Sequence, residues 1–390
     1  MNLNRFRFWI LVIIVSISGF TQGMLLPLIA VIFEHKGVSS SLNGFNATSL
    51  YIGILLISPF MEIPLRKYGY KPVIAFGGGT VIVSLLLFPL WQSFWFWFVL
   101  RLFIGIGDHA LHFATQTWIT SSSDEQKRGR SIALYGLFFS IGFAAGPLMT
   151  PLVDINPSLP FIVSAVLCLA AWIFIFTIGN ELPIEAVGVN SFIETMKRFS
   201  TAWKYAWLAF LPPFVYGFLE SSLNGSFPVY ALRKGLDVSN VSVILTSFSI
   251  GTLITQLPLG MLSDKYGRRN VLIIVLFAGF LTFTGASFVE TSFIGLIIAI
   301  LAAGMMVGST FSLGIGYMTD LTPKNLLPTG NLMCGIFFSF GSLSGPIMGG
   351  FIIQWFENIS FFMVISTLLF AIALILLTFG NRRTEVSNIH

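Results

Sequence analysis

The chain carries the stretch Arg101-Leu-Phe-Ile-Gly105-Ile-Gly107-Asp108-His109-Ala-Leu-His112-Phe-Ala-Thr115. It lies within an apolar run from Phe94 to about Ile119, which is long enough for a helix to cross a bilayer. On a helix, Asp108 and His112 fall within roughly 20° of the line through Arg101, so the three side chains share one face. Ionisable groups at membrane depth are costly unless they face protein or a water-filled cavity. The stretch therefore predicts a membrane-spanning helix whose polar face points into a helix bundle.

The composition indicates an integral membrane protein. Hydrophobic residues make up 55% of the 390 residues and charged residues only 9%, whereas about a quarter of a soluble domain is charged. The net charge of +5 is not gathered on one amphipathic or aromatic-flanked element, so we expect no nucleic-acid partner. Cys168 and Cys334 lie in apolar runs, and we interpret them as buried thiols rather than a disulfide or a metal pair.

Apolar runs recur along the whole chain. The first follows Arg5 and Arg7 and is too long for a signal peptide. The predicted spans are approximately 8–33, 43–64, 72–91, 94–119, 130–153, 159–179, 204–232, 238–262, 269–289, 292–318, 327–352 and 359–380. We therefore predict an all-α membrane protein with twelve transmembrane helices in two six-helix halves, residues 1–180 and 203–390, joined by a cytoplasmic linker at 181–202.

The basic residues predict the orientation. With both termini cytoplasmic, the inner segments hold about 17 lysines and arginines and the outer loops about 3, namely Lys36, Arg233 and Lys234. Because basic residues accumulate on the cytoplasmic side, we expect a multi-pass protein of the cell membrane with both termini inside.

Three short patterns recur in order. Gly19-Phe20-Thr21-Gln22 returns as Gly217-Phe218-Leu219-Glu220, and Lys67-Tyr68-Gly69 returns as Lys265-Tyr266-Gly267, both 198 residues later. Gly142-x-x-x-Gly146-Pro147 returns as Gly341-x-x-x-Gly345-Pro346, 199 residues later. Such repeats are typical of transporters, so we predict two parallel, pseudo-symmetric halves with a substrate route between them.

These motifs resemble those of the major facilitator superfamily. Gly260-Met-Leu262-Ser-Asp264-Lys265-Tyr-Gly267-Arg268-Arg269 is similar to its loop signature, and Arg101-x-x-x-Gly105-x-Gly107 to its second motif, whose arginine is implicated in proton coupling. Gly142 to Pro147 resembles the glycine-proline motif of drug/proton antiporters, although Thr150-Pro151 replaces its final glycines. The resemblance covers essentially the whole chain and implies a secondary transporter of the antiporter-type branch.

The loop signature also has a physical interpretation. Asp264 and the bases Lys265, Arg268 and Arg269 can pair, cap helix ends and hold two helices together in one state. We favour a gating contact over plain positive-inside decoration here. For the first-half copy, with Arg66 in place of the aspartate and Tyr70-Lys71 in place of the basic pair, we favour decoration. The repeated glycines permit close helix packing, and Pro147 and Pro346 permit bends.

The polar face of the fourth span is a candidate proton relay. Asp108 and His112 are i,i+4 neighbours that could exchange a proton, with Arg101 holding negative charge or substrate. The alternative for Asp108, His109 and His112 is a static buried hydrogen-bond network.

Glu220 is the second candidate. It lies between Tyr216 and Asn224 at helical spacing and occupies the repeat position of Gln22, which predicts a central site able to carry a proton. The alternative is a neutral, hydrogen-bonded acid that joins two helices. For Glu62, beside Arg66, we favour a local ion pair.

We predict a proton-coupled exporter of a small organic molecule that works by alternating access. Its partners are the substrate, protons and the lipid bilayer; we expect a monomer without cofactor or metal and no enzymatic activity. The alternatives are a proton-coupled importer of a sugar or small organic solute, a membrane enzyme with a metal on His109, His112 and a carboxylate, and a non-transporting receptor. No phosphate-binding loop of the G-x-x-x-x-G-K-[ST] type is present, which argues against primary pumping.

Overall fold

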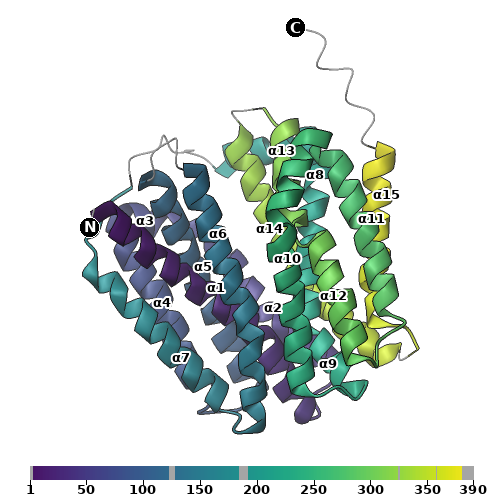
Figure 1. The fold of residues 1–390 in the computed structure, drawn as a ribbon. Coiled ribbons are helices and arrows are strands. Elements are labelled where there is room, and N and C mark those ends of the chain that lie inside the picture. The colour runs from purple at the N-terminus through teal and green to yellow at the C-terminus, as the bar shows by residue number, and fades with distance from the viewer. Residues whose placement is uncertain (1–2, 123–127, 184–191, 324–325, 357, 380–390) are drawn as a thin grey trace. The chain divides into compact units, whose positions relative to one another are not determined.

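The structure is a computed structural model that describes residues 3–122, 128–183, 192–323, 326–356 and 358–379. All elements in these ranges are helical (Figure 1). In chain order they are α1 (Leu3–His35), α2 (Ser40–Ile57), η1 (Ser58–Phe60), α3 (Glu62–Tyr68), α4 (Tyr70–Leu87), α5 (Phe94–Ser122), α6 (Arg128–Ala145), η2 (Gly146–Asp154), α7 (Leu159–Trp172), η3 (Ile173–Thr177), α8 (Phe192–Gly225), α9 (Phe227–Arg233), α10 (Val238–Tyr266), α11 (Arg268–Ala286), α12 (Phe293–Val307), α13 (Thr310–Leu321), α14 (Leu327–Trp355) and α15 (Phe361–Phe379).

The chain divides into two compact units. The N-terminal unit comprises Met1–Ala186, Asn224–Leu232 and Asp237–Thr246, and the C-terminal unit comprises Val187–Leu223, Arg233–Leu236 and Ser247–His390. The units follow the predicted halves over most of the chain, but residues 224–232 and 237–246 group with the first unit. Residues 184–191 of the predicted linker lie outside the described ranges. The domain boundaries at 180 and 203 stay a prediction.

The described helices account for ten candidate membrane spans, or eleven when a bent pair counts as one span. That pair is Ser40–Phe60 with Glu62–Tyr68, bent by 57° at the predicted second span. The predicted seventh span corresponds to α8, which is kinked at Ala206 and carries Pro212 and Pro213 inside it. Because these prolines and Glu220 reduce its apolar character, α8 is not among the candidate spans, and a total of twelve is not shown.

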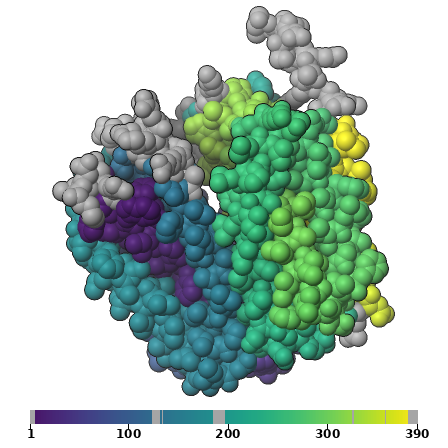
Figure 2. All heavy atoms as spheres, in the orientation of Figure 1, coloured from purple at the N-terminus to yellow at the C-terminus, as the bar shows by residue number. Residues whose placement is uncertain are grey.

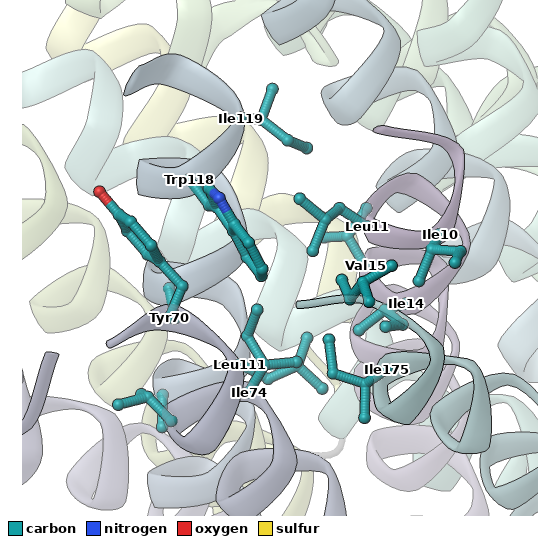
Figure 3. Packing of buried hydrophobic residues seen from close by; sticks show 14 of the residues in the cluster. Ile10, Leu11, Ile14, Val15, Tyr70, Ile74, Leu111, Trp118, Ile119 and Ile175 are labelled. Atoms are coloured by element: carbon teal, nitrogen blue, oxygen red, sulfur yellow. The ribbon is translucent and has the colours of Figure 1, made fainter. Parts of the chain in front are cut away.

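The N-terminal unit has a core of aliphatic and aromatic side chains at one end of its helices. Figure 3 shows side chains of α1, α4, α5 and η3 around a common centre: Ile10, Leu11, Ile14, Val15, Tyr70, Ile74, Leu111, Trp118, Ile119 and Ile175. All of these are buried. In the space-filling view, the side chains fill the spaces between neighbouring helices within each unit on the face shown (Figure 2). Dense packing of this kind is what holds helices together where lipid gives no hydrophobic driving force.

Glycines set the helix crossings in the N-terminal unit. A Cβ at Gly19 would meet the carbonyl oxygen of Phe139, and one at Gly142 would meet that of Ser16, so α1 and α6 touch backbone to backbone. Between α2 and α5, Gly53 and Gly105 lie in the same way against Leu102 and Leu50.

The C-terminal unit repeats these crossings. Gly217 lies against Phe338, and Gly341 against Phe214, which joins α8 to α14. Gly251 and Gly304 lie against Leu301 and Phe248, which joins α10 to α12. Each contact is displaced by 198 or 199 residues from its N-terminal counterpart. The sequence repeat is therefore also a repeat of helix contacts.

Candidate transport site

Arg101 is fully buried within the N-terminal unit, on the face of α5 toward α2. Its Nη1 donates to Asn46 Oδ1 at 3.2 Å, and Asn46 Nδ2 donates to the carbonyl oxygen of Phe94 at 3.1 Å. Neither Nε nor Nη2 of Arg101 has a hydrogen-bond partner among the described residues. The guanidinium therefore keeps part of its hydrogen-bonding capacity unused, which is costly in a buried position.

Asp108 lies two turns further along α5 and faces α1. Gln22 Nε2 donates to its Oδ2 at 2.6 Å, and the carboxyl is fully buried. Ser18 is a further neighbour on α1, but neither its hydroxyl nor Asp108 Oδ1 reaches hydrogen-bonding geometry with any described residue. Within the described ranges no salt bridge includes Asp108 or Arg101.

The two histidines of α5 contact two other elements. His109 Nε2 lies 3.0 Å from Ser58 Oγ, at the first residue of η1 and just before the bend of the second span. His112 Nδ1 lies 2.8 Å from the hydroxyl of Tyr135 on α6. The polar side chains predicted to share one face of α5 thus contact three different neighbours, namely α1, the α2–η1 segment and α6.

This arrangement differs from the direct relay considered for Asp108 and His112. Although they are i,i+4 neighbours, no hydrogen bond joins their side chains in the described structure, because each is engaged by a different helix. Gln22 was among the predicted site residues, whereas Tyr135 and Ser58 were not. A hydroxyl within an apolar run is a common feature, and only tertiary contacts show which ones meet a histidine.

Glu220 lies on α8 in the C-terminal unit and is half-buried. Tyr216, one turn earlier, is a neighbour of its carboxyl on the helix. Asn224, one turn later, is buried near the end of the helix. The structure therefore confirms the helical placement of all three residues, while their roles stay a prediction.

The loop signature organises one end of the C-terminal unit. Gly267 adopts φ 88°, a left-handed conformation that lets the chain turn from α10 into α11. Arg268 Nη2 lies 3.4 Å from Asp264 Oδ1, while its Nη1 lies 3.3 Å from Asp320 Oδ1 on α13. Arg269 donates to the carbonyl oxygen of Leu376 at 2.9 Å, near the end of α15. The predicted pairing and capping are thus observed inside one unit, and a gating role remains a prediction.

The degenerate first-half copy makes comparable contacts. Gly69 adopts φ 87°, and Lys71 Nζ donates to the carbonyl oxygen of Ile178 at 2.8 Å, in the position where Arg269 caps α15. Tyr70 stacks on Trp118 with ring centroids 5.2 Å apart. Arg66 pairs with Glu62, as predicted. The interpretation of this copy as mere charge decoration is therefore incomplete, because Lys71 joins α4 to the end of η3.

The glycine-proline motifs serve packing in both units. Gly142 and Gly146 lie against α1, and Gly341 and Gly345 lie against α8. Pro147 stands at the start of η2, whereas Pro346 lies inside α14 without ending it. The hinge role of these prolines stays a prediction.

Comparison with known proteins shows the family. The model of the Major Facilitator Superfamily matches residues 11–239 and 209–389. The chain is 55% identical over 376 residues to the MFS-type transporter YfkF of Bacillus subtilis, covering 96% of this chain and 95% of that protein. It is 22% identical to the MFS-type transporter Ent638_1421 of Enterobacter sp., with 93% of each chain covered.

Solved structures share the fold. The crystal structure of the nucleoside transporter NupG superposes with a TM-score of 0.75 at 16% identity, covering 97% of each chain. A bacterial homologue of the human lysosomal transporter Spinster, in an inward-facing and unoccupied conformation, gives a TM-score of 0.70 at 15% identity, covering 97% of this chain and 95% of that one. The chain therefore belongs to the Major Facilitator Superfamily and is a multi-pass membrane transporter of the MFS type.

Proposed function

We propose that this transporter uses the proton gradient to export a small organic molecule. The observation that carries the proposal is the environment of Asp108, a fully buried carboxyl in a membrane-spanning helix. Its one hydrogen bond among the described residues comes from the neutral amide of Gln22. A carboxyl in such a place is held at lowest cost as the neutral acid, so it is suited to take up a proton in one state and to lose it in another.

The surrounding contacts suggest how proton movement is coupled to helix movement. When Asp108 is neutral, its unpartnered Oδ1 can carry the proton while Oδ2 keeps the bond to Gln22. When Asp108 is ionised, the carboxylate needs further donors or water, which favours a state that opens α1 and α5 to solvent. Loss and gain of one proton would then bias the packing of α1 on α5.

Glu220 supplies a second titratable group at the repeat position of Gln22. In the proposed cycle, Asp108 and Glu220 take up protons on the outer side, substrate enters the inward-open cavity, and the protons leave inside as substrate is bound. We also propose that both termini are cytoplasmic, because the basic residues accumulate on that side, and that the monomer is the working unit in the cell membrane.

A direct test compares cells that lack the protein with cells that overproduce it. Accumulation of a panel of fluorescent organic dyes is measured with and without an uncoupler. Export predicts that overproduction lowers accumulation of at least one dye and that the uncoupler abolishes the difference. In proteoliposomes, Asp108→Asn should abolish transport driven by a pH gradient, while Glu62→Gln, whose carboxylate is exposed and pairs with Arg66, should not. Undiminished transport by Asp108→Asn would remove Asp108 from the relay.

The second candidate is proton-coupled uptake of a small polar solute. The glycine-proline motif that suggested antiport packs in the same way in both units, so it does not by itself favour export. The similar fold of NupG, a nucleoside transporter, adds nucleosides to the solutes worth testing. Counterflow of labelled nucleosides and sugars under pH gradients of either sign distinguishes uptake from export, because the accelerating gradient has opposite direction in the two cases.

A further inference from the structure

Glu220 lies one helical turn from Tyr216, which belongs to a cluster of three aromatic rings in the C-terminal unit. Tyr216 on α8 lies 6.3 Å from Phe311 on α13 and 6.2 Å from Phe338 on α14, measured between ring centroids. Phe311 and Phe338 pack edge to face at 5.2 Å. The three rings therefore contact one another pairwise, one from each of three helices, and the carboxyl of Glu220 lies one helical turn beyond Tyr216.

The side chains of this group are only partly buried. Glu220, Tyr216, Phe311 and Phe338 are each half-buried, whereas their neighbours Gly217, Phe218 and Leu219 on α8 are buried. The side chains thus form a partly open surface rather than part of the closed core. The crossing of α8 and α14 through Gly217 and Gly341, immediately beside Tyr216, holds Tyr216 close to Phe338.

The combination of an acid with aromatic faces has a specific chemistry. A carboxylate attracts a cation, and the faces of aromatic rings stabilise the same charge through their quadrupoles, most strongly for weakly hydrated organic cations. An anionic solute would be repelled by the carboxylate. We propose that Glu220, with Tyr216, Phe311 and Phe338, binds the positively charged group of an organic-cation substrate.

The proposal rests on the proposed function, because it makes this group the substrate-binding part of the C-terminal unit. The equivalent positions in the N-terminal unit hold different residues, 198 or 199 positions earlier: Ser18, Gln22, His112 and Phe139. They combine one phenylalanine ring with a histidine, an amide and a hydroxyl. The carboxyl beside Gln22 is that of Asp108, which the proposed function uses for the proton, so we assign cation recognition to the C-terminal unit.

Equilibrium binding tests the proposal with two probes of one shape and opposite charge. Tetraphenylphosphonium and tetraphenylborate are each titrated against the purified full-length protein in lipid nanodiscs, without a pH gradient, and empty nanodiscs correct for partition into lipid. We expect saturable binding of tetraphenylphosphonium and none of tetraphenylborate. Glu220→Gln should weaken phosphonium binding at least tenfold, while Glu62→Gln leaves it unchanged.

The rings are tested separately from the charge. Tyr216→Phe keeps the ring but loses the hydroxyl and should retain most of the affinity, whereas Phe338→Leu should weaken binding several-fold. Thermal unfolding of each variant shows whether it is folded; if Glu220→Gln is not, Phe338→Leu and Phe311→Leu carry the test. Equal binding of both probes, or unchanged phosphonium affinity in Glu220→Gln, overturns the proposal.

The outcome is separable from that of the proposed function. Binding is measured without a proton gradient, so its failure alongside uncoupler-sensitive export in cells would reject the organic-cation substrate and leave proton coupling intact. Binding that depends on Glu220, together with transport unaffected by uncoupler, would support the substrate class and reject proton coupling.

Discussion

The two units place different chemistry at equivalent positions of one backbone pattern. In the N-terminal unit, His112 packs edge to face against Phe139 with ring centroids 5.4 Å apart. In the C-terminal unit, Phe311 and Phe338 occupy the same repeat positions and pack in the same way at 5.2 Å. The helix geometry is thus preserved while a titratable ring is exchanged for an apolar one.

The fourth span shows the same contrast more strongly. The counterparts of Arg101 and Asp108, 199 residues later, are Ile300 and Val307. Both are buried, as Arg101 and Asp108 are. Equally buried positions therefore hold isoleucine and valine in one unit and ionisable side chains in the other, so packing alone does not require ionisable groups there.

The largest effect is expected from breaking the shared backbone pattern. A Cβ at Gly142 would lie 3.0 Å from Phe20 N, and one at Gly341 would lie 2.8 Å from Phe218 N, besides meeting the carbonyl oxygens of Ser16 and Phe214. Because backbone atoms cannot yield as a flexible side chain can, Gly142→Ala and Gly341→Ala should each destabilise their unit by about 3 kcal/mol. Thermal unfolding and size-exclusion profiles of the purified variants measure this.

The same two helices provide matched controls. Gly136 on α6 and Gly335 on α14 are also 199 residues apart, and a Cβ at either would meet no atom within 4 Å. Alanine there should be neutral or stabilising by up to about 1 kcal/mol, because alanine favours the helix. If Gly136→Ala and Gly142→Ala were equally harmful, the glycine crossings would not be what both units share.

The second prediction makes the N-terminal unit resemble its counterpart. Asp108→Val installs the residue type found at Val307 and removes a buried carboxyl whose one hydrogen bond with a described residue comes from Gln22. Since an apolar side chain of similar size is cheaper to bury, we expect the variant to fold with equal or higher stability, within about 2 kcal/mol. Transport driven by a pH gradient should fall at least about a hundredfold, roughly 2.7 kcal/mol in activation free energy.

Proteoliposome uptake and thermal unfolding are measured on the same Asp108→Val preparation. Gln22→Leu serves as its partner, because it removes the amide that donates to Asp108 while leaving the carboxyl. A loss of stability in Asp108→Val with transport retained would indicate that Asp108 has the structural role considered as its alternative.

The third prediction compares the two capping bases. Arg269 donates to the carbonyl oxygen of Leu376, and Lys71, 198 residues earlier, donates to that of Ile178. Each is a charge-assisted bond at the end of a helix, so Arg269→Ala and Lys71→Ala should each cost about 1–2 kcal/mol. The unfolding midpoints of the two variants measure this loss of stability, with Lys67→Ala on α3 as the control. A harmless Lys71→Ala would restore the interpretation of the first-half loop as charge decoration.

The sequence predicted the family, the helical class and the repeat because these depend on local or periodic signals. Apolar length identifies spans, and the glycines that recur at one spacing identify the crossings. It did not predict the partners of the polar groups, since Tyr135 meets His112, and Ser58 meets His109, only through tertiary packing. Nor did it predict the bend after Ser40–Phe60, because the apolar run in the sequence continues through the residues at which the helix changes direction.

The smallest effect is expected for the exposed pair Glu62 and Arg66. Arg66 occupies the repeat position of Asp264, which instead pairs with Arg268 four residues later. Both pairs are i,i+4 and exposed to solvent in part, but Arg268 also contacts Asp320 on another helix. Because an isolated exposed pair contributes only about 0–1 kcal/mol and is screened by salt, Glu62→Gln should change stability by less than about 0.5 kcal/mol. Asp320→Asn should lower the free energy of unfolding more than Glu62→Gln does. Unfolding at low and at high salt measures both variants. Equal effects would show that the contact of Arg268 with Asp320 does not stabilise the C-terminal unit.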